Sequence, residues 1–336
     1  MSHPHETPPL MRTPLAGSAV EPAAPAAFAD PFDDPVLRRA VARAAGLREH
    51  AVGPPGAPLH GAFERQRLGR RQWVWAPYGL YAPVCADDTA AAALADFLGQ
   101  ARRGAWSVQA QLNPLCPRQG AVADSARALG YQVTPRQTHV LDLRPGLDAL
   151  RRGYHATKRN QLGKPLRVPS RIACTSQGAG DPADLDAYFD VYADSLRRWG
   201  RAGGFPYPRS LFQDLLASCA ARLWTHHVHG RLACAMWILE SRHQALYWQG
   251  VSRIDEDQKA AHPMVRLMDA VIQDLCARKV PVLNLGASEG LPQVQRFKEE
   301  FGAQPLAYSA LQWESTAWRW LHRARGLVRG WVARPG

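Results

Sequence analysis

The stretch Val282-Leu-Asn-Leu-Gly-Ala-Ser-Glu-Gly-Leu-Pro-Gln-Val-Gln-Arg-Phe-Lys-Glu-Glu-Phe-Gly302 decides the fold of the second half of this chain. Its apolar residues before Gly286 form a short run that a glycine interrupts, which predicts a buried strand followed by a turn. Apolar side chains then recur at helical spacing, on one face of a short helix: Leu291, Val294, Phe297 and Phe301. Gly302 is suited to end that helix in the left-handed conformation.

Lys298 is the exception on this helix. At about 100° per residue its side chain falls inside the apolar face, between Leu291 and Val294, whereas Glu299 and Glu300 point away from it. A lysine on such a face either extends its nitrogen to the rim of the apolar surface or is committed to an anion. Both readings stay open at this point.

The length and net charge of the chain restrict the number of domains and the kind of partner it binds. The chain has 336 residues, 46% of them hydrophobic, which is enough for two domains with two cores. A formal net charge of +12 favours an anionic partner such as a nucleic acid, a phosphorylated substrate or a membrane surface. The alternative is a general preference for arginine, which far outnumbers lysine here.

The cysteines and the N-terminus indicate a cellular compartment. The six cysteines are scattered and none forms a Cys-x-x-Cys pair, which is typical of reduced thiols in a cytoplasmic protein. Residues 1–34 are rich in proline and alanine and read as a disordered tail without the pattern of a signal peptide. No apolar run approaches the roughly 20 residues that cross a bilayer.

Strands and helices alternate in the first half. We predict a short helix from Pro35, strands at 72–76, 106–112 and 138–143, and helices at 87–104 and 122–129. This alternation indicates an α/β domain over residues 35–145. Pro77-Tyr-Gly79 is its most distinctive short motif.

Positive charge gathers at the junction between the halves. Residues 149–180 contain no acidic residue but seven lysines and arginines. A solvated basic helix is one reading. The other is a surface that faces phosphate groups, for which Lys158 and Arg159 are the best pair.

The second half, residues 146–314, predicts a defined order of elements. A strand at 171–176 and two helices precede an antiparallel meander of three strands at 222–228, 232–240 and 244–251. His262-Pro263 opens a strongly amphipathic helix. The strand and helix of 282–302 and a last strand at 305–314 complete the order.

This order and several motifs resemble the Fem-type peptidyltransferase group of GNAT-like acyltransferases. The matching residues are Leu141-Asp-Leu143, Lys158-Arg159, Tyr247-Trp-Gln-Gly250, His262-Pro263, Asn284-Leu-Gly286 and, most specifically, Phe297-Lys-Glu-Glu-Phe-Gly-Ala303. The resemblance implies a tandem of GNAT-like domains, each a mixed α/β (α+β) sheet flanked by helices. It also implies that Lys298 lies in the acyl-transfer site.

The resemblance further implies transfer of an acyl or aminoacyl group from a thioester or ester onto an amine, in cell-envelope or exopolysaccharide metabolism. The donor would be acyl-CoA or an aminoacyl-tRNA, with no tightly bound cofactor. One feature departs from ordinary GNAT enzymes. Residues 252–261, where those enzymes carry a glycine-rich acetyl-CoA loop, contain no glycine, although such loops hold pyrophosphate on backbone N–H groups.

Amine acylation assigns roles to further residues. It needs a neutral amine, stabilisation of an oxyanion and a proton for the leaving group. We predict that Lys298 supplies positive charge to the oxyanion or a donor phosphate and that Tyr247 donates the proton. Gln249 should share the strand face of Tyr247. Asn284 and Ser288 follow a strand end, where ligand clefts form. No general base can be named.

Two other features carry weaker hypotheses. His227 and His229 share a strand face, but no further ligand has suitable spacing, so we predict no metal site. Residues 315–336 form a basic, tryptophan-rich amphipathic helix that either packs on the protein or lies on an anionic membrane. The second reading would place the protein at the inner face of the membrane.

The sequence therefore predicts a cytoplasmic N-acyltransferase with substrate-binding residues Lys158, Arg159, Gln249, Asn284 and Ser288 around Lys298 and Tyr247. Its partners would be an anionic small-molecule or tRNA donor and an amine acceptor. Two rivals are a non-catalytic tRNA- or nucleic-acid-binding module, whose binding would depend steeply on salt, and a scaffold at the membrane surface.

Overall fold

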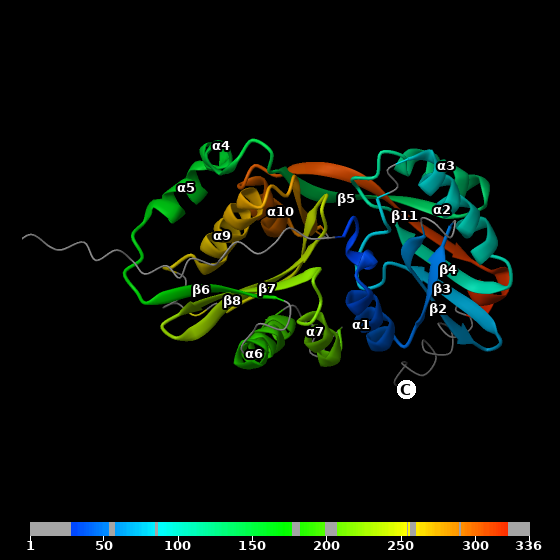
Figure 1. The fold of residues 1–336 in the computed structure, drawn as a ribbon, viewed down its shortest axis with the longest axis horizontal. Helices are drawn as coiled ribbons and strands as arrows, with labels where there is room; N and C mark the ends of the chain where they lie inside the picture. The colour runs from blue at the N-terminus through cyan, green and yellow to red at the C-terminus, as the bar shows by residue number, and fades with distance from the viewer. Residues whose placement is uncertain are drawn as a thin grey trace, which may run out of the picture.

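A computed structural model describes residues 28–53, 58–84, 87–176, 182–198, 207–253, 255, 260–288 and 290–321. Its strands join in one mixed sheet (Figure 1). Their order across the sheet is β1 (Arg48–Val52), β2 (Leu59–Arg67), β3 (Arg70–Trp75), β4 (Ala105–Gln111), β11 (Gln304–Glu314), β5 (Gln132–Asp142), β10 (Val282–Ala287), β9 (Ala245–Ser252), β8 (Arg231–Glu240), β7 (Ala221–Val228) and β6 (Ser170–Ser176).

Helices cover both faces of this sheet. In Figure 1, α6 and α7 lie on one side of strands β6 to β8, and α9, α4 and α5 lie on the other. The mixed α/β class predicted from the sequence is confirmed. The helix bounds are α1 (Pro35–Ala45), α2 (Asp88–Ala101), α3 (Gln119–Ala128), α4 (Leu147–Gly153), α5 (Ala156–Gly163), α6 (Pro182–Arg198), α7 (Arg209–Leu215), α9 (Pro263–Ala277) and α10 (Pro292–Glu299).

The predicted elements are present, but the sequence analysis missed four. Strands β1 and β2 read Arg-Glu-His-Ala-Val and Leu-His-Gly-Ala-Phe-Glu-Arg-Gln-Arg, without the alternation that marks a half-buried strand. Helices α4 and α5 are short and were read as one basic segment. The predicted tails at 1–34 and 315–336 fall largely outside the described residues.

The last strand of the chain belongs to the first half of the sheet. Strand β11 pairs antiparallel with β4 on one side and with β5 on the other. Figure 1 shows β5 and β11 running from one half of the molecule to the other. The domain boundary at 145/146 stays a prediction, because the sheet itself is continuous.

Strands β9 and β10 part almost as soon as they meet. They pair in parallel at Leu283 with Ala245 and at Asn284 with Leu246, and at no later residue. Beyond these pairs β9 carries a bulge, since Trp237 lies opposite Gln249 but Ile238 lies opposite Tyr247. A bulge adds one residue and bends the strand. The result is an opening in the middle of the sheet.

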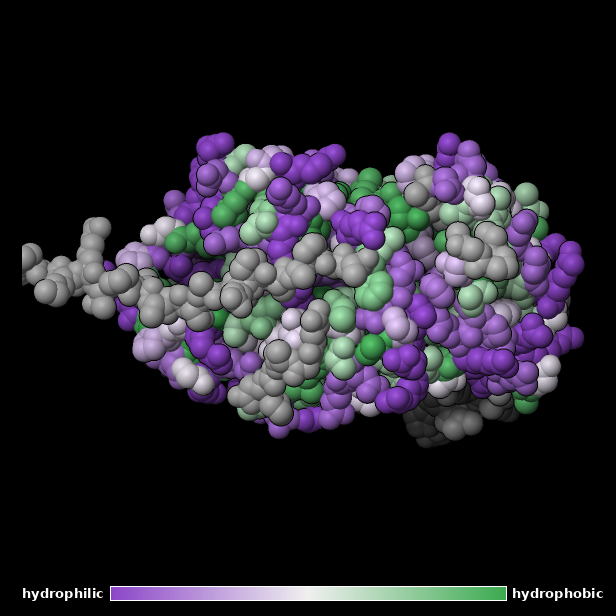
Figure 2. All heavy atoms as spheres, in the orientation of Figure 1, coloured by the Kyte–Doolittle hydropathy of each residue, from purple (hydrophilic) through white to green (hydrophobic). Residues whose placement is uncertain are grey.

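The surface is mainly polar on the face drawn in Figure 2. Hydrophilic side chains cover most of both halves there, and hydrophobic ones occur in separate groups. Among the described residues, the helices are too short or too polar to cross a membrane.

A buried ionic cluster fixes strands β7 and β8 to α9. The carboxylate of Glu240 is fully buried and accepts from Arg222 Nε at 2.9 Å and from Arg278 Nη1 at 2.7 Å. Arg278 also donates to Asp274 at 2.6 Å. Breaking a buried pair costs more than the pair contributes, because one charge is left without a partner.

Replacing Glu240 by alanine should therefore lower the free energy of unfolding by about 3–5 kcal/mol. Urea denaturation measures the loss. The control is Asp124→Ala, which removes the exposed ion pair with Arg127 and should cost less than about 1 kcal/mol. Equal losses of unfolding free energy in the two variants would show that the buried cluster stabilises the fold no more than an exposed ion pair does.

Candidate active site

A cleft of about 840 Å³ lies where β9 and β10 part. It takes residues from both halves of the chain. The first half supplies the turn after β3 and part of β5, and the second half supplies the parted strands and α10. Its polar lining residues include Tyr78, Tyr81, Gln111, Arg136, His139, Tyr207, Tyr247, Gln249, Ser288, Gln295, Lys298 and Tyr308.

The turn after β3 enters the cleft in a strained conformation. Ala76 and Tyr78 have positive φ angles of 52° and 64°, which L-residues adopt rarely. The indole Nε1 of Trp248, the bulged residue of β9, donates to the Tyr78 carbonyl at 2.9 Å. This bond ties the first half of the chain to the wall of the cleft. Backbone strain of this kind often accompanies functional sites.

Lys298 lies inside the protein at the edge of the cleft. It is 2% exposed, and its Nζ donates to the carbonyl oxygens of Gly286 at 2.7 Å and Ala287 at 2.9 Å. The apolar face predicted for the helix that carries Lys298 is only partly buried. Leu291 and Val294 are 56% and 38% exposed, because α10 turns that end towards the cleft and the solvent.

Tyr247 lines the cleft, and burial raises the pKa of its phenol. Its ring covers Gly250, where an added Cβ would lie 1.7 Å from the hydroxyl oxygen. The predicted sharing of a strand face by Tyr247 and Gln249 is wrong. Residues directly opposite in a sheet share a face, and the bulge places Gln249 opposite Trp237 and Tyr247 opposite Ile238.

Asn284 and Ser288 lie on opposite sides of the turn that ends β10. Asn284 is fully buried, and its Oδ1 accepts from Thr138 Oγ1 at 2.7 Å and from the Gly286 N–H at 2.9 Å. It therefore holds the strand end and is not among the lining residues. Ser288 does line the cleft.

Lys158 does not face solvent as a phosphate-binding residue would. It is 5% exposed, its Nζ lies 2.9 Å from Glu300 Oε2, and it sits over the rings of Phe297 and Phe301. The contact joins α5 to α10. A substrate-binding role stays a prediction, but the observed role is to position the helix that carries Lys298.

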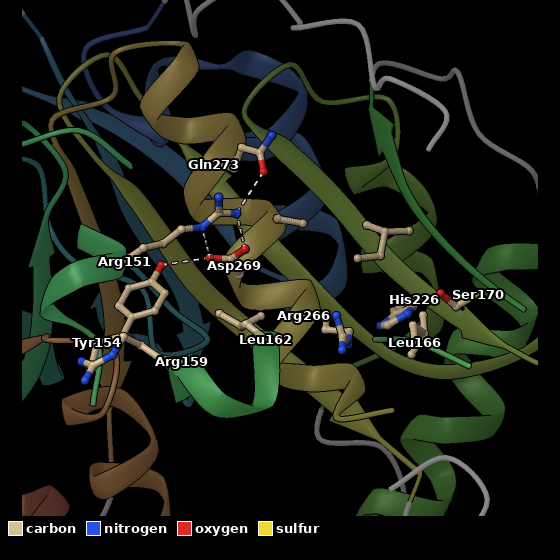
Figure 3. Close-up of a pocket in the computed structure, with 12 residues that line it drawn as sticks. Arg151, Tyr154, Arg159, Leu162, Leu166, Ser170, His226, Arg266, Asp269 and Gln273 are labelled. Atoms are coloured by element: carbon tan, nitrogen blue, oxygen red, sulfur yellow. Dashed lines mark hydrogen bonds and ion pairs between the residues drawn. The ribbon is translucent and has the colours of Figure 1, made fainter. Parts of the chain in front are cut away.

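Arg159 lies beside Tyr154, at one end of a second cavity of about 620 Å³ that it lines together with residues of α5 and α9 (Figure 3). It donates to the carbonyls of Arg152 and Tyr154 at the end of α4. Arg266 likewise donates to the carbonyls of Gln161 and Lys164 at the end of α5. Cations are favourable at helix C-termini, where carbonyl groups lack helical partners.

Arginines outnumber carboxylates in the lining of this second cavity, where Arg151, Arg159 and Arg266 accompany Asp269. Figure 3 shows Arg151 paired with Asp269, whose carboxylate also accepts from the Tyr154 hydroxyl. Of the seven basic residues in 149–180, Arg151 and Lys158 pair with carboxylates. The phosphate-facing surface stays a prediction.

His139 is the main site residue that the sequence analysis missed. It is 1% exposed, lies on β5 and lines the cleft near Ser288 and Lys298. Within the sequence it is only one residue of a predicted strand. In the sequence, His139 is about 150 positions from Ser288 and Lys298, so no local motif connects it with them.

The described part of the cleft wall carries cations and neutral polar groups but no carboxylate. Arg136 and Lys298 are its lysine and arginine side chains. Such a wall favours a substrate that is anionic or develops negative charge. Among the described residues no three histidine, cysteine or acidic side chains are grouped so as to hold a metal ion.

Comparison with known proteins places this geometry in a class. Residues 150–299 match the sequence model of the acetyltransferase (GNAT) domain. This segment holds β9, β10, α9 and α10, the elements that form the parted strands and carry Lys298. Over these residues the chain is thus similar to a GNAT domain. A comparison with curated proteins gives no match.

Solved structures define the arrangement more closely. The crystal structure of FemX superposes with a TM-score of 0.60 at 11% identity, over 81% of this chain and 90% of FemX. A C-terminal domain assigned to a lysylphosphatidylglycerol synthetase from Agrobacterium fabrum gives 0.56 at 13% identity, over 88% and 92%. L-PGS from Bacillus licheniformis gives 0.54 at 14%, over 86% and 94%. Over more than four fifths of its length, the chain therefore has a Fem-like GNAT fold.

The contact of Lys158 with Glu300 predicts a pH-dependent stability. Burial raises the pKa of Glu300, but hydrogen bonds and positive charge from Lys158 and Arg296 outweigh this and lower it. A carboxylate with a lowered pKa stabilises the fold above its unfolded pKa of about 4.3, and this contribution disappears as pH falls through the folded value.

Lys158→Met should therefore cost about 1–3 kcal/mol at pH 7, and much less in acid. Urea denaturation of both proteins from pH 7 to pH 3 measures the difference. Lys164→Met, which changes an exposed lysine of the same segment, is the control. A cost that is unchanged in acid would contradict the assigned ion pair.

Proposed function

We propose that the protein is an N-acyltransferase that moves an acyl or aminoacyl group from an ester or thioester onto an amine. The reaction would take place in the cleft between β9 and β10. The observation that carries this proposal is the position of Lys298. Its side chain is buried, yet its nitrogen lies at the wall of a cleft that lacks carboxylates among its described residues.

The residues in the cleft fit the needs of acyl transfer. Attack of an amine on a carbonyl carbon creates an oxyanion, which a fixed positive charge stabilises most strongly where water is excluded. Lys298 would provide that charge, and its two bonds to backbone carbonyls hold its nitrogen in place. Tyr247, whose raised pKa keeps the phenol protonated, would give a proton to the leaving group.

The donor we propose is an aminoacyl ester and not acyl-CoA. Residues 252–261 contain no glycine, and so they lack the glycine-rich loop whose backbone N–H groups would hold a pyrophosphate. The name of the Agrobacterium fabrum protein also points to an aminoacyl group, which supports the same choice.

The proposal is tested by direct transfer assays. Purified protein is incubated with a panel of aminoacyl-tRNAs and acyl-CoA thioesters, each with a set of primary amines, and amide products are detected by mass spectrometry. We expect an amide with at least one ester donor. Lys298→Met should lower kcat about 10²–10³-fold with little change in KM, because the charge acts on the transition state.

Lys279→Met, an exposed lysine at the end of α9, serves as the matched control and should keep full activity. Circular dichroism and thermal melting show whether each variant is folded. Folded Lys298→Met with wild-type kcat would remove Lys298 from the mechanism. Absence of any amide product across the whole panel would refute the proposed function.

A further inference from the structure

Three side chains from separate segments meet at the wall of the cleft. His139 lies on β5, Ser288 follows the end of β10, and Glu299 ends α10. The Nδ1 atom of His139 lies 3.5 Å from Ser288 Oγ, and its Nε2 lies 3.6 Å from Glu299 Oε1. The order hydroxyl, imidazole, carboxylate is the arrangement that moves protons in many group-transfer sites.

The path of β10 explains how these groups come together. Strands β10 and β5 are in register at Asn284 and Val140, but the register shifts before Ala287 pairs with Thr138. Gly286 within this irregular segment has a φ of 73°, a conformation that glycine adopts without strain. The turn brings Ser288 back over β5, where His139 is buried.

The surroundings of His139 determine its protonation state. Burial lowers its pKa, and so does the charge of Lys298, while Glu299 acts in the opposite direction. Lys298 and Glu299 are both from α10, β10 contributes the neutral Ser288, and β11 meets His139 at Pro305. The imidazole is therefore neutral at pH 7, with a lone pair available.

The tautomer follows from the two neighbours. Glu299 Oε1 lies 3.6 Å from Nε2, just beyond hydrogen-bond distance, but its negative charge favours the N–H of the neutral ring on Nε2. The lone pair is then on Nδ1, facing the hydroxyl of Ser288. Among the described lining residues the other ionisable side chains are tyrosines, arginine and lysine, which are poor bases at neutral pH.

We propose that His139 is the general base of the acyl transfer and takes a proton from the acceptor ammonium through the hydroxyl of Ser288. This inference rests on the proposed N-acyltransferase function and adds the base that this function needs. Glu299 favours the required tautomer through its negative charge and is a positioning residue.

The proton and electron balance closes without a further reactant. The ammonium gives one proton to Ser288 Oγ, and the hydroxyl passes its own proton to His139 Nδ1, which leaves a neutral amine. The amine lone pair forms the C–N bond, and the carbonyl electron pair moves onto oxygen beside Lys298. Collapse of this intermediate breaks the bond to the leaving oxygen or sulfur, which takes the proton of the Tyr247 hydroxyl, and the second proton of the former ammonium restores that hydroxyl. His139 then releases its proton to water.

The test compares two acceptors in His139→Gln. With the alkylamine that serves as acceptor in the transfer assay, which is protonated at pH 7, the variant should lose about 10²–10⁴-fold in kcat/KM. With hydroxylamine, which is neutral at pH 7 and needs no deprotonation before attack, it should lose less than about 10-fold by the same reasoning. His243→Gln, an exposed histidine in the β8–β9 turn, is the control.

The pH profile gives a second readout. In the wild type kcat/KM should fall in acid as His139 is protonated, below the ordinary histidine pKa of about 6.5. This acid limb should be absent in His139→Gln. In Glu299→Gln it should move to lower pH, because the carboxylate that raises the pKa of His139 has gone. Ring ¹⁵N shifts in NMR spectra should show His139 neutral at pH 7.

The outcomes separate the inference from the function on which it rests. Equal losses with both acceptors, an acid limb that persists in His139→Gln, or a doubly protonated His139 at pH 7 would each overturn the role of His139 while transfer by the wild type stands. A wild type that acylates neither acceptor from any donor refutes both.

Discussion

The parting of β9 and β10 after two residue pairs is the constraint on which the rest of the structure depends. Where two strands separate inside a sheet, their N–H and C=O groups lose ladder partners and need others. Lys298 supplies partners to two carbonyls of β10, those of Gly286 and Ala287. The lysine therefore completes the fold at the point where the cleft opens, and the same contacts keep its charge at the cleft wall.

This dual role explains why α10 is held so firmly. Lys158 joins α5 to Glu300, and the backbone N–H of His155 donates to the Glu300 carbonyl at 2.8 Å. The rings of Phe297 and Phe301 lie under the Lys158 nitrogen, where a cation gains from the negative face of the aromatic ring. The basic segment of residues 149–180 thus contributes to the site by holding α10, the helix that carries Lys298.

Much of the second half could be predicted from the sequence because its apolar periodicity is strong. The meander, α9, and the strand and helix around Lys298 all follow from such patterns, and Gly302 has the positive φ expected of a helix end. The inward direction of Lys298 was one of two open readings, and only its contacts decide between them. Strands β1 and β2 have no comparable pattern, since their residues are mixed in polarity.

The geometry of the site was harder to predict, for three physical reasons. A bulge shifts side chains to the other face of a strand, so alternation along β9 put Gln249 on the wrong side of Tyr247. Long-range pairing leaves no local signal, so His139 could not be connected with Ser288. Charge runs mislead in a third way, because composition does not say which groups the charges meet. Arg159 and Arg266 meet the ends of helices.

Acidic and basic side chains are placed differently around the cleft. A cleft that stabilises an oxyanion must keep carboxylates away from the reacting carbonyl, yet an amine acceptor needs a base. The described residues reconcile these demands by distance. The carboxylate of Glu299 is not among the residues that line the cleft, and it lies 3.6 Å from His139 Nε2 with its side chain 44% exposed. The negative charge can thus orient the base without opposing Lys298 at the carbonyl oxygen.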